Sequence, residues 1–204
     1  MHIAVAGNIG SGKTTLTALL AKNFGWSPHY EDIDTNPYLQ SFYEDMQRWS
    51  FNLQIYFLNH RFRQIIQIRK SKKNVIQDRT IYEDAYIFAP NLHSMNLMSS
   101  RDFENYLSLF ELVSSLIQPP DLLIYLRASV PTLVSQIQKR GREYESAIRL
   151  DYLKNLNERY EEWAEGYKLG KLLVVDVDNI KFSESPDQLG IVIDNVNAQL
   201  NGLF

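Results

Sequence analysis

The sequence predicts an α/β fold, with a central parallel sheet of five strands covered by helices on both faces. Two observations predict it. Short apolar segments alternate with longer segments whose apolar residues recur at helical spacing, which is typical of parallel sheets buried between helices. The first apolar segment also leads through a glycine-rich turn directly into a helical segment. We expect a single domain over residues 1–204.

The predicted strands and helices follow one another in regular order. We predict strands at 2–6, 28–31, 74–78, 122–127 and 172–177. We predict helices at 13–24, 37–44, 48–72, 81–89, 102–117, 131–140 and 150–166, with a last helix from about 186. Leu16, Leu19 and Leu20 form an apolar face on the first helix. Pro119 ends the helix at 102–117, because proline does not continue a helix.

The composition sets limits on the class of protein. Of the 204 residues, 45% are hydrophobic and 22% are charged, which is typical of a globular chain. The net charge of −3 argues against binding nucleic acid through bulk electrostatic attraction. The chain has no cysteine, which excludes disulfides, thiolate metal sites and a cysteine nucleophile. Since it opens in a predicted strand and has no run of about 18 apolar residues, we expect no signal peptide, no membrane contact and a cytoplasmic location.

The segment at 7–14 matches the phosphate-binding pattern G-x-x-x-x-G-K-[ST], known as the P-loop. It reads Gly7-Asn8-Ile9-Gly10-Ser11-Gly12-Lys13-Thr14, and Thr15 continues it. Its glycines let several backbone N–H groups turn toward one anion, and the positive end of the following helix adds to that site. We therefore expect a nucleotide site, with Lys13 reaching the β- and γ-phosphates and the Thr14 hydroxyl binding Mg²⁺.

Acidic residues follow two of the predicted strands. Asp78 and Arg79 come at the end of the third strand, where a carboxylate is well placed to hold Mg²⁺ and an arginine to neutralise phosphate. The alternative is a solvated strand end. Glu31 ends the second strand and is a candidate general base for a hydroxyl that attacks phosphorus. Asp32 and Asp34 compete with Glu31 for this role on spacing alone.

Two further features allow either a binding or a structural interpretation. Arg140 and Arg142 flank Gly141, so the segment near 139–147 is either a mobile lid that binds phosphate or an exposed basic turn. Gln54 lies among apolar residues of the long predicted helix. A buried glutamine needs partners for its amide, and on the helix alone a core contact explains Gln54 better than a ligand does.

Four ordered segments of the chain point to a known family. They are the P-loop, Arg48-Trp49-Ser50-Phe51-Asn52-Leu53-Gln54, the run from Asp78-Arg79-Thr80 to Tyr86-Ile87-Phe88, and Arg140-Gly141-Arg142. Through them, residues 1 to about 165 resemble the deoxynucleoside kinase family. The P-loop is widely shared, whereas the second and third segments are far more specific. The resemblance implies a P-loop kinase fold, ATP-dependent phosphorylation of a deoxynucleoside 5′-hydroxyl, and a homodimer packed through helices.

The resemblance also implies roles for individual residues. It makes Glu31 the general base, and it places Asp78 and Arg79 near Mg²⁺ and the 5′-oxygen, with Lys13 on the phosphates. In the acceptor site, Gln54 reads the base, Arg61 and Asp84 form an ion pair beside it, Phe88 stacks on it, and Tyr43 and Glu145 hold the sugar 3′-hydroxyl. Arg140 and Arg142 match lid arginines that cover the phosphates of ATP.

The predicted acceptor site favours some bases over others. A glutamine amide pairs equally well with adenine and cytosine, so Gln54 does not separate them. An ionised Asp84 only accepts hydrogen bonds, so the Arg61–Asp84 pair disfavours thymine and suits deoxyadenosine, deoxycytidine or, through Arg61, deoxyguanosine. The form of the segment at 78–85 looks most like bacterial purine deoxynucleoside kinases, and we favour deoxyadenosine.

The chain departs from the family's pattern at two positions. Gln136 stands where many relatives carry a further lid arginine, so the lid has one cation fewer. Asp78 stands where many animal relatives have glutamate. The shorter side chain keeps its charge, so we expect its role to be retained.

Two other functions are compatible with a P-loop. A nucleoside monophosphate kinase of the thymidylate kinase type also pairs a P-loop with an Asp-Arg strand end, but it needs more cations around the acceptor phosphate and no hydroxyl base. A nucleotide-binding switch or ATPase module is the second alternative. A GTP-binding switch would carry Asn-Lys-x-Asp to read guanine, and the sequence contains no Asn-Lys pair.

Overall fold

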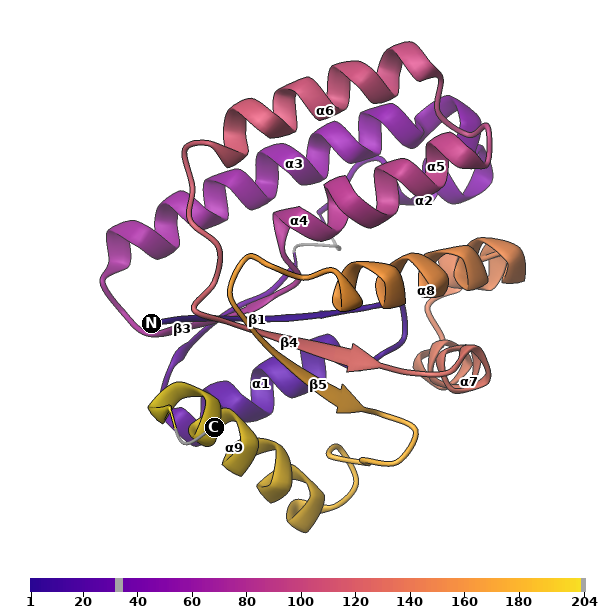
Figure 1. Ribbon diagram of the computed structural model, residues 1–204. Helices are drawn as coiled ribbons and strands as arrows, with labels where there is room; N and C mark the ends of the chain where they lie inside the picture. Colours follow the sequence, from indigo (N-terminus) through magenta and orange to yellow (C-terminus); the bar gives the residue numbers. More distant parts are fainter. Residues whose placement is uncertain (32–34, 203–204) are drawn as a thin grey trace.

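The computed structural model describes residues 1–31 and 35–202, and these residues form one sheet of five parallel strands (Figure 1). The strands are β1 (His2–Gly7), β2 (Ser27–His29), β3 (Val75–Asp78), β4 (Leu122–Arg127) and β5 (Lys171–Asp176). Their order is β2-β3-β1-β4-β5, and each neighbouring pair is parallel. The α/β fold predicted from the sequence is confirmed.

Helices cover both faces of the sheet (Figure 1). One face carries α1 (Lys13–Phe24) and α9 (Pro186–Asn201), and the other carries α3 (Met46–Ser71), α4 (Ile81–Glu83), α5 (Ala89–Ser94), α6 (Ser100–Ser114) and α8 (Leu150–Glu165). The remaining helices are α2 (Leu39–Glu44), which packs on α3, and α7 (Val130–Arg140), near the carboxyl end of β4. Over residues 1–31 and 35–202, no helix is both long and apolar enough to cross a membrane.

Several helix boundaries differ from the prediction because capping residues set them. α3 begins at Met46 rather than at residue 48, because the Asp45 side chain accepts a hydrogen bond of 3.0 Å from the Arg48 backbone N–H. α6 begins at Ser100 and ends at Ser114, and Ser99 caps its start. The prediction that this helix extends to residue 117 is wrong by three residues, because α6 ends at Ser114.

The helix predicted at 81–89 is longer and less regular than expected. It runs through α4, a π-helical turn η1 (Asp84–Phe88) and α5, and it ends at Ser94. Pro90 is accommodated in the first turn of α5 because it directly follows the π-helical turn, in which the Ala89 N–H donates to the Asp84 carbonyl five residues back rather than four. π-helical turns of this kind occur often at functional sites.

The register of the sheet brings the P-loop and Asp78 together. β1 and β3 are neighbours, and Val5 pairs with Asp78. Asp78 therefore ends β3 beside the last residues of β1, from which the P-loop departs at Gly7. The Arg79 backbone N–H continues the ladder by donating to the Val5 carbonyl at 2.9 Å. The carboxyl ends of the strands, where parallel sheets bind ligands, thus carry the predicted site.

Candidate active site

The P-loop passes so close to neighbouring atoms that its glycines are required. Gly10 has φ +87°, and a Cβ on it would lie 2.8 Å from the Leu133 carbonyl oxygen of α7. A Cβ on Gly7 would lie 2.6 Å from Ser11 Oγ. No described side chain caps the start of α1, so its first N–H groups remain available to an anion. The loop therefore has the geometry of a phosphate site.

Lys13 is buried and folded back on the loop that precedes it. Its Nζ donates to the carbonyl oxygens of Gly7 at 2.8 Å and Asn8 at 2.9 Å. Burial, together with the nearby charge of Arg79, lowers the pKa of Lys13 to about 7. No carboxylate of the described residues forms an ion pair with Nζ, so a bound phosphate would supply a direct anionic partner.

The side chains of Thr14 and Asp78 lie together at the carboxyl edge of the sheet. The Thr14 hydroxyl donates to Asp78 Oδ2 at 2.5 Å, and Asp78 Oδ1 is buried with no hydrogen-bond partner among the described residues. Mg²⁺ is usually held by one or two protein oxygens together with phosphate and water. These two oxygens fit that role, although no cluster of three or more acidic or histidine ligands occurs in the described part of the chain.

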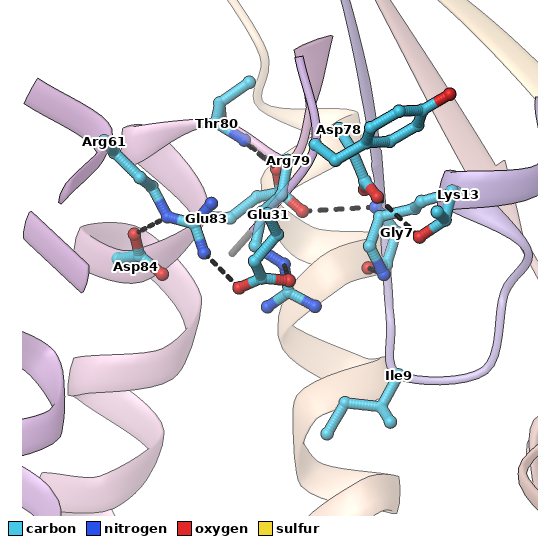
Figure 2. A network of polar contacts seen from close by, with 12 residues as sticks. Gly7, Ile9, Lys13, Glu31, Arg61, Asp78, Arg79, Thr80, Glu83 and Asp84 are labelled. Carbon is cyan, nitrogen blue, oxygen red and sulfur yellow. Dashed lines mark hydrogen bonds and ion pairs between the residues drawn. The ribbon is translucent and has the colours of Figure 1, made fainter. Parts of the chain in front are cut away.

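Glu31 and Asp84 are bridged by Arg61 (Figure 2). Arg61 Nη2 donates to Glu31 Oε1 at 2.6 Å and Arg61 Nε donates to Asp84 Oδ2, while Arg79 Nε lies 3.5 Å from Glu31 Oε2. Burial alone would raise the pKa of Glu31, but the positive charges of Arg79, Arg61 and Lys13 outweigh it and bring the pKa to about 2. Glu31 is thus ionised at neutral pH.

Most of the residues predicted to bind the acceptor line the same cavity. Its lining includes Glu31, Tyr43, Gln54, Arg79, Asp84, Phe88 and Glu145. Arg61 is outside that lining and reaches the cavity through its bonds to Glu31 and Asp84. The Arg79 guanidinium lies over the Phe88 ring, 4.5 Å from its centroid. The cavity also has apolar walls, from Ile9 of the P-loop and from residues that had no predicted site role, which are Leu39, Phe42, Leu53, Phe57 and Tyr152.

Gln54 is 2% exposed, and its Oε1 has no hydrogen-bond partner among the described residues. The interpretation of Gln54 as a residue satisfied by the core is therefore wrong for this oxygen. An unpaired buried acceptor is costly, so its presence in a cavity lining indicates a ligand that donates to it.

The predicted lid comprises the end of α7 and a 3₁₀ turn, η2 (Glu143–Ala147). Gly141 ends α7 with φ +68°, and Arg140 binds Glu145 through hydrogen bonds of 3.0 Å from Nε and 2.6 Å from Nη2. Arg142 lies 3.5 Å from the same carboxylate. Both arginines contact the buried Glu145, and Arg140 is also exposed to solvent, so the lid stays a prediction beside the alternative of an exposed basic turn.

A second hollow separates the lid from the P-loop. It is lined by Gly10, Gly12, Lys13, Thr14, Thr15, Gln136, Lys139, Arg140 and Arg142. Seven of the residues predicted to bind the donor phosphates therefore line one hollow, whereas Gly7, Asn8, Ile9 and Ser11 lie outside its lining. Gln136 also lines it, and Lys139, the first residue of the predicted lid, adds a cation that had no predicted role.

Some predictions about acidic residues need correction or extension. Asp78 and Arg79 are buried, so a solvated strand end is excluded. Asp32 and Asp34, the alternatives to Glu31, lie outside the described residues. Glu83 received no role from the sequence, yet it is fully buried and accepts hydrogen bonds from Gly7 and Thr80. The spacing Thr80-x-x-Glu83, which is that of a capping box, is the signal that would have found it.

Comparison with known proteins agrees with this geometry. The family model described as deoxynucleoside kinase matches residues 3–201. A deoxyadenosine/deoxycytidine kinase of Bacillus subtilis is 38% identical over 98% of this chain and 93% of its own length, and a deoxyadenosine kinase of Dictyostelium discoideum is 39% identical over 94% and 77%. A structure of deoxyadenosine kinase from M. mycoides with bound dATP is 33% identical, covers 97% of this chain and 99% of its own, and has a TM-score of 0.85.

The fold and the site define a P-loop phosphotransferase, and the chain belongs to the deoxynucleoside kinase family. It is an enzyme that transfers a phosphoryl group from ATP, with Mg²⁺, to the 5′-hydroxyl of a deoxynucleoside. This assignment decides against a nucleoside monophosphate kinase and against a nucleotide-binding switch or ATPase module.

Proposed function

We propose that deoxyadenosine is the preferred acceptor of this kinase. The observation that carries the proposal is the unpaired Gln54 Oε1 in the cavity, which favours a base with an exocyclic amine, adenine or cytosine, and the resemblance of residues 78–85 to bacterial purine deoxynucleoside kinases favours adenine of the two. The exocyclic amine of adenine donates to Gln54 Oε1, and the adjacent ring nitrogen accepts from the Gln54 NH₂ group. Relatives named as deoxyadenosine kinases support the same acceptor, and those named for deoxycytidine and deoxyguanosine make these nucleosides the next candidates.

The proposed mechanism is an in-line transfer between the two hollows. Glu31 accepts the proton of the 5′-hydroxyl, and its pKa of about 2 keeps it ionised and able to do so. In a loose transition state the attacking oxygen loses its proton late, so a weak base is sufficient. Lys13 and Arg79 stabilise charge on the moving phosphoryl group. Thr14 and Asp78 would hold Mg²⁺, which neutralises phosphate charge when it is bound.

The remaining site roles are proposed on the same basis. Tyr43 and Glu145 hold the sugar 3′-hydroxyl, and both line the cavity. Phe88 stacks on the base. Arg140 and Arg142 cover the donor phosphates as part of a lid near 139–147, which belongs to a single kinase domain over residues 1–204.

We also propose a homodimer that forms through helices. α6 supports it, because Leu109 and Leu112 lie about one turn apart on this helix and Leu116 follows in the turn after it, with Leu112 and Leu116 63% and 62% exposed. Light scattering of the wild type is expected to give twice the chain mass, and Leu112→Glu is expected to give a monomer. A monomeric wild type would contradict the proposal. The cytoplasmic location and the absence of nucleic-acid binding stay predictions.

The acceptor proposal is tested by initial rates with ATP and each of the four deoxynucleosides, their ribose counterparts and dAMP. Deoxyadenosine is expected to give the highest kcat/KM. Preference for deoxycytidine or deoxyguanosine would reject the base assignment and leave the kinase reaction intact. Rates with dAMP that exceed those with deoxyadenosine would instead place the acceptor at the monophosphate.

A further inference from the structure

Glu83 joins three parts of the molecule that are far apart in the sequence. Its side chain is fully buried and accepts from the Gly7 N–H at 3.2 Å, the Thr80 N–H at 2.7 Å, the Thr80 hydroxyl at 3.2 Å and the Tyr160 hydroxyl at 2.8 Å. Oε1 binds Gly7 and Tyr160, and Oε2 binds Thr80. Figure 2 shows Glu83 between the start of the P-loop and the turn after β3.

Both backbone groups that Glu83 holds belong to phosphate-site elements. Gly7 is the first residue of the P-loop, whose Lys13 bonds back to the Gly7 carbonyl. Thr80 follows Arg79, which has φ +66°, a left-handed conformation that a residue with a side chain rarely adopts. The bond to the Thr80 N–H therefore supports a strained turn that aims the Arg79 side chain at Glu31.

We propose that Glu83 is a positioning residue for phosphoryl transfer, and that its carboxylate sets the P-loop and the Asp78–Arg79 turn in the relative placement that lets Lys13 and Arg79 act on the same phosphoryl group. Glu83 lines neither the acceptor cavity nor the donor hollow. Its effect is therefore expected on the donor side and on turnover rather than on nucleoside binding. This role rests on the proposed functions of Lys13 and Arg79.

The negative charge of Glu83 also favours the charged forms of Lys13 and Arg79. It raises the pKa of Lys13 against the lowering effect of burial, and it also raises the pKa of Arg79. The described residues put no cation in contact with the carboxylate, so it is held by hydrogen bonds alone. Its partners are thus specific backbone positions rather than a mobile side-chain charge.

The variant Glu83→Gln tests the role because an amide cannot serve both backbone groups. Its NH₂ must replace either Oε1 or Oε2, and each side carries one hydroxyl, which can reverse, and one backbone N–H, which cannot. One backbone N–H then faces a donor. We expect kcat to fall at least about ten-fold and KM for ATP to rise about three-fold or more, with KM for the deoxynucleoside within about two-fold of wild type.

Tyr160→Phe is the matched control. It removes one hydrogen bond to Glu83 but leaves both backbone N–H groups paired, so its kinetic constants are expected to stay within about two-fold of wild type. If Glu83→Gln does not fold, Glu83→Asp replaces it, because a side chain one methylene shorter cannot reach both backbone groups at once. The active fraction of each variant is measured by titrating deoxynucleoside binding calorimetrically.

Three results would overturn the role of Glu83. The first is wild-type kcat and KM for ATP in the Glu83 variant. The second is a fall in kcat that matches the lost active fraction with both KM values unchanged, since this indicates folding alone. The third is an equal effect of Tyr160→Phe. Failure of the wild type to phosphorylate deoxyadenosine would instead reject the proposed acceptor. The Glu83 variants would then be compared with the wild type on the deoxynucleoside that the wild type does phosphorylate.

Discussion

Arg140 is held by Glu145 through two hydrogen bonds, of 3.0 Å from Nε to Oε2 and 2.6 Å from Nη2 to Oε1. The proposed roles of the two residues lie on different substrates, because Arg140 serves the donor phosphates and Glu145 the acceptor sugar. The pair uses two of the five N–H donors of Arg140 and one lone pair on each oxygen of Glu145, so both groups keep capacity for their own substrate. The contact therefore connects the proposed donor and acceptor sites directly.

The variant Glu145→Gln tests the acceptor half of this relationship. We expect kcat/KM for deoxyadenosine to fall about 10- to 100-fold, because the amide accepts less strongly from the 3′-hydroxyl. Wild type should also discriminate against 2′,3′-dideoxyadenosine, and the variant should lose most of that discrimination. The exposed Glu158 of α8 offers a control, since Glu158→Gln should change neither rate. Full discrimination in the Glu145 variant would remove Glu145 from the sugar site.

Glu31→Gln is expected to lower kcat about 10²- to 10³-fold, because the amide cannot take the proton of the 5′-hydroxyl. Deoxynucleoside binding should persist, because Gln54 and Asp84 are unchanged. Initial rates and calorimetric binding measure the two effects separately. Glu44→Gln, at an exposed position of α2, should behave like wild type. Near-normal turnover of the Glu31 variant would show that another group takes the proton.

Stability should depend on the charge of Glu31. Its pKa is lowered from 4.5 to about 2 in the folded protein by Arg79, Arg61 and Lys13. A lowered carboxyl pKa contributes stability that is present above the unfolded value of 4.5 and is lost as pH falls toward about 2. The full contribution is up to about 3 kcal/mol. Urea unfolding at about pH 6 and pH 3 should therefore show a steeper loss for wild type than for Glu31→Gln, and parallel losses would contradict the pairing.

Asp78 is expected to control the requirement for Mg²⁺. Chelation should abolish transfer, and Asp78→Asn should raise the Mg²⁺ concentration for half-maximal rate about ten-fold or more, because a neutral amide is a poorer ligand. Thr14→Ser retains the hydroxyl and serves as the control. A Mg²⁺ titration curve for Asp78→Asn that overlays the wild-type curve would place the ion elsewhere.

Gln54 is expected to recognise the amino group of adenine. Wild type should disfavour purine 2′-deoxyriboside, which lacks this amine, by about ten-fold in kcat/KM relative to deoxyadenosine. Gln54→Leu removes the unpaired oxygen and should bring the two substrates within about two-fold of each other. Gln47→Leu, at an exposed position of the same helix, controls for the substitution itself. Retained discrimination in Gln54→Leu would assign the amine to another residue.

Contiguous residues were enough to predict the P-loop and the alternation of strands and helices. The P-loop could be predicted because its hydrogen-bonding geometry depends on consecutive residues, from Gly7 to Thr14, and on the helix that begins at Lys13. Alternation is readable because apolar periodicity directly reflects which face of a segment is buried. The helix ends at Asp45 and Ser99 were missed because one capping hydrogen bond shifts a boundary by two residues.

Pairings between distant residues depended on packing. Arg61 and Glu31 are 30 residues apart in the sequence and Glu83 and Gly7 are 76 apart, so no local sequence pattern predicts either contact. The unpaired state of Gln54 Oε1 likewise follows from what surrounds α3 in space. Sequence therefore determined the phosphate loop, the fold class and the family resemblance. The register of β1 against β3 and the packing of helices on the sheet decided which charges touch, because these contacts form only when separate segments are brought together.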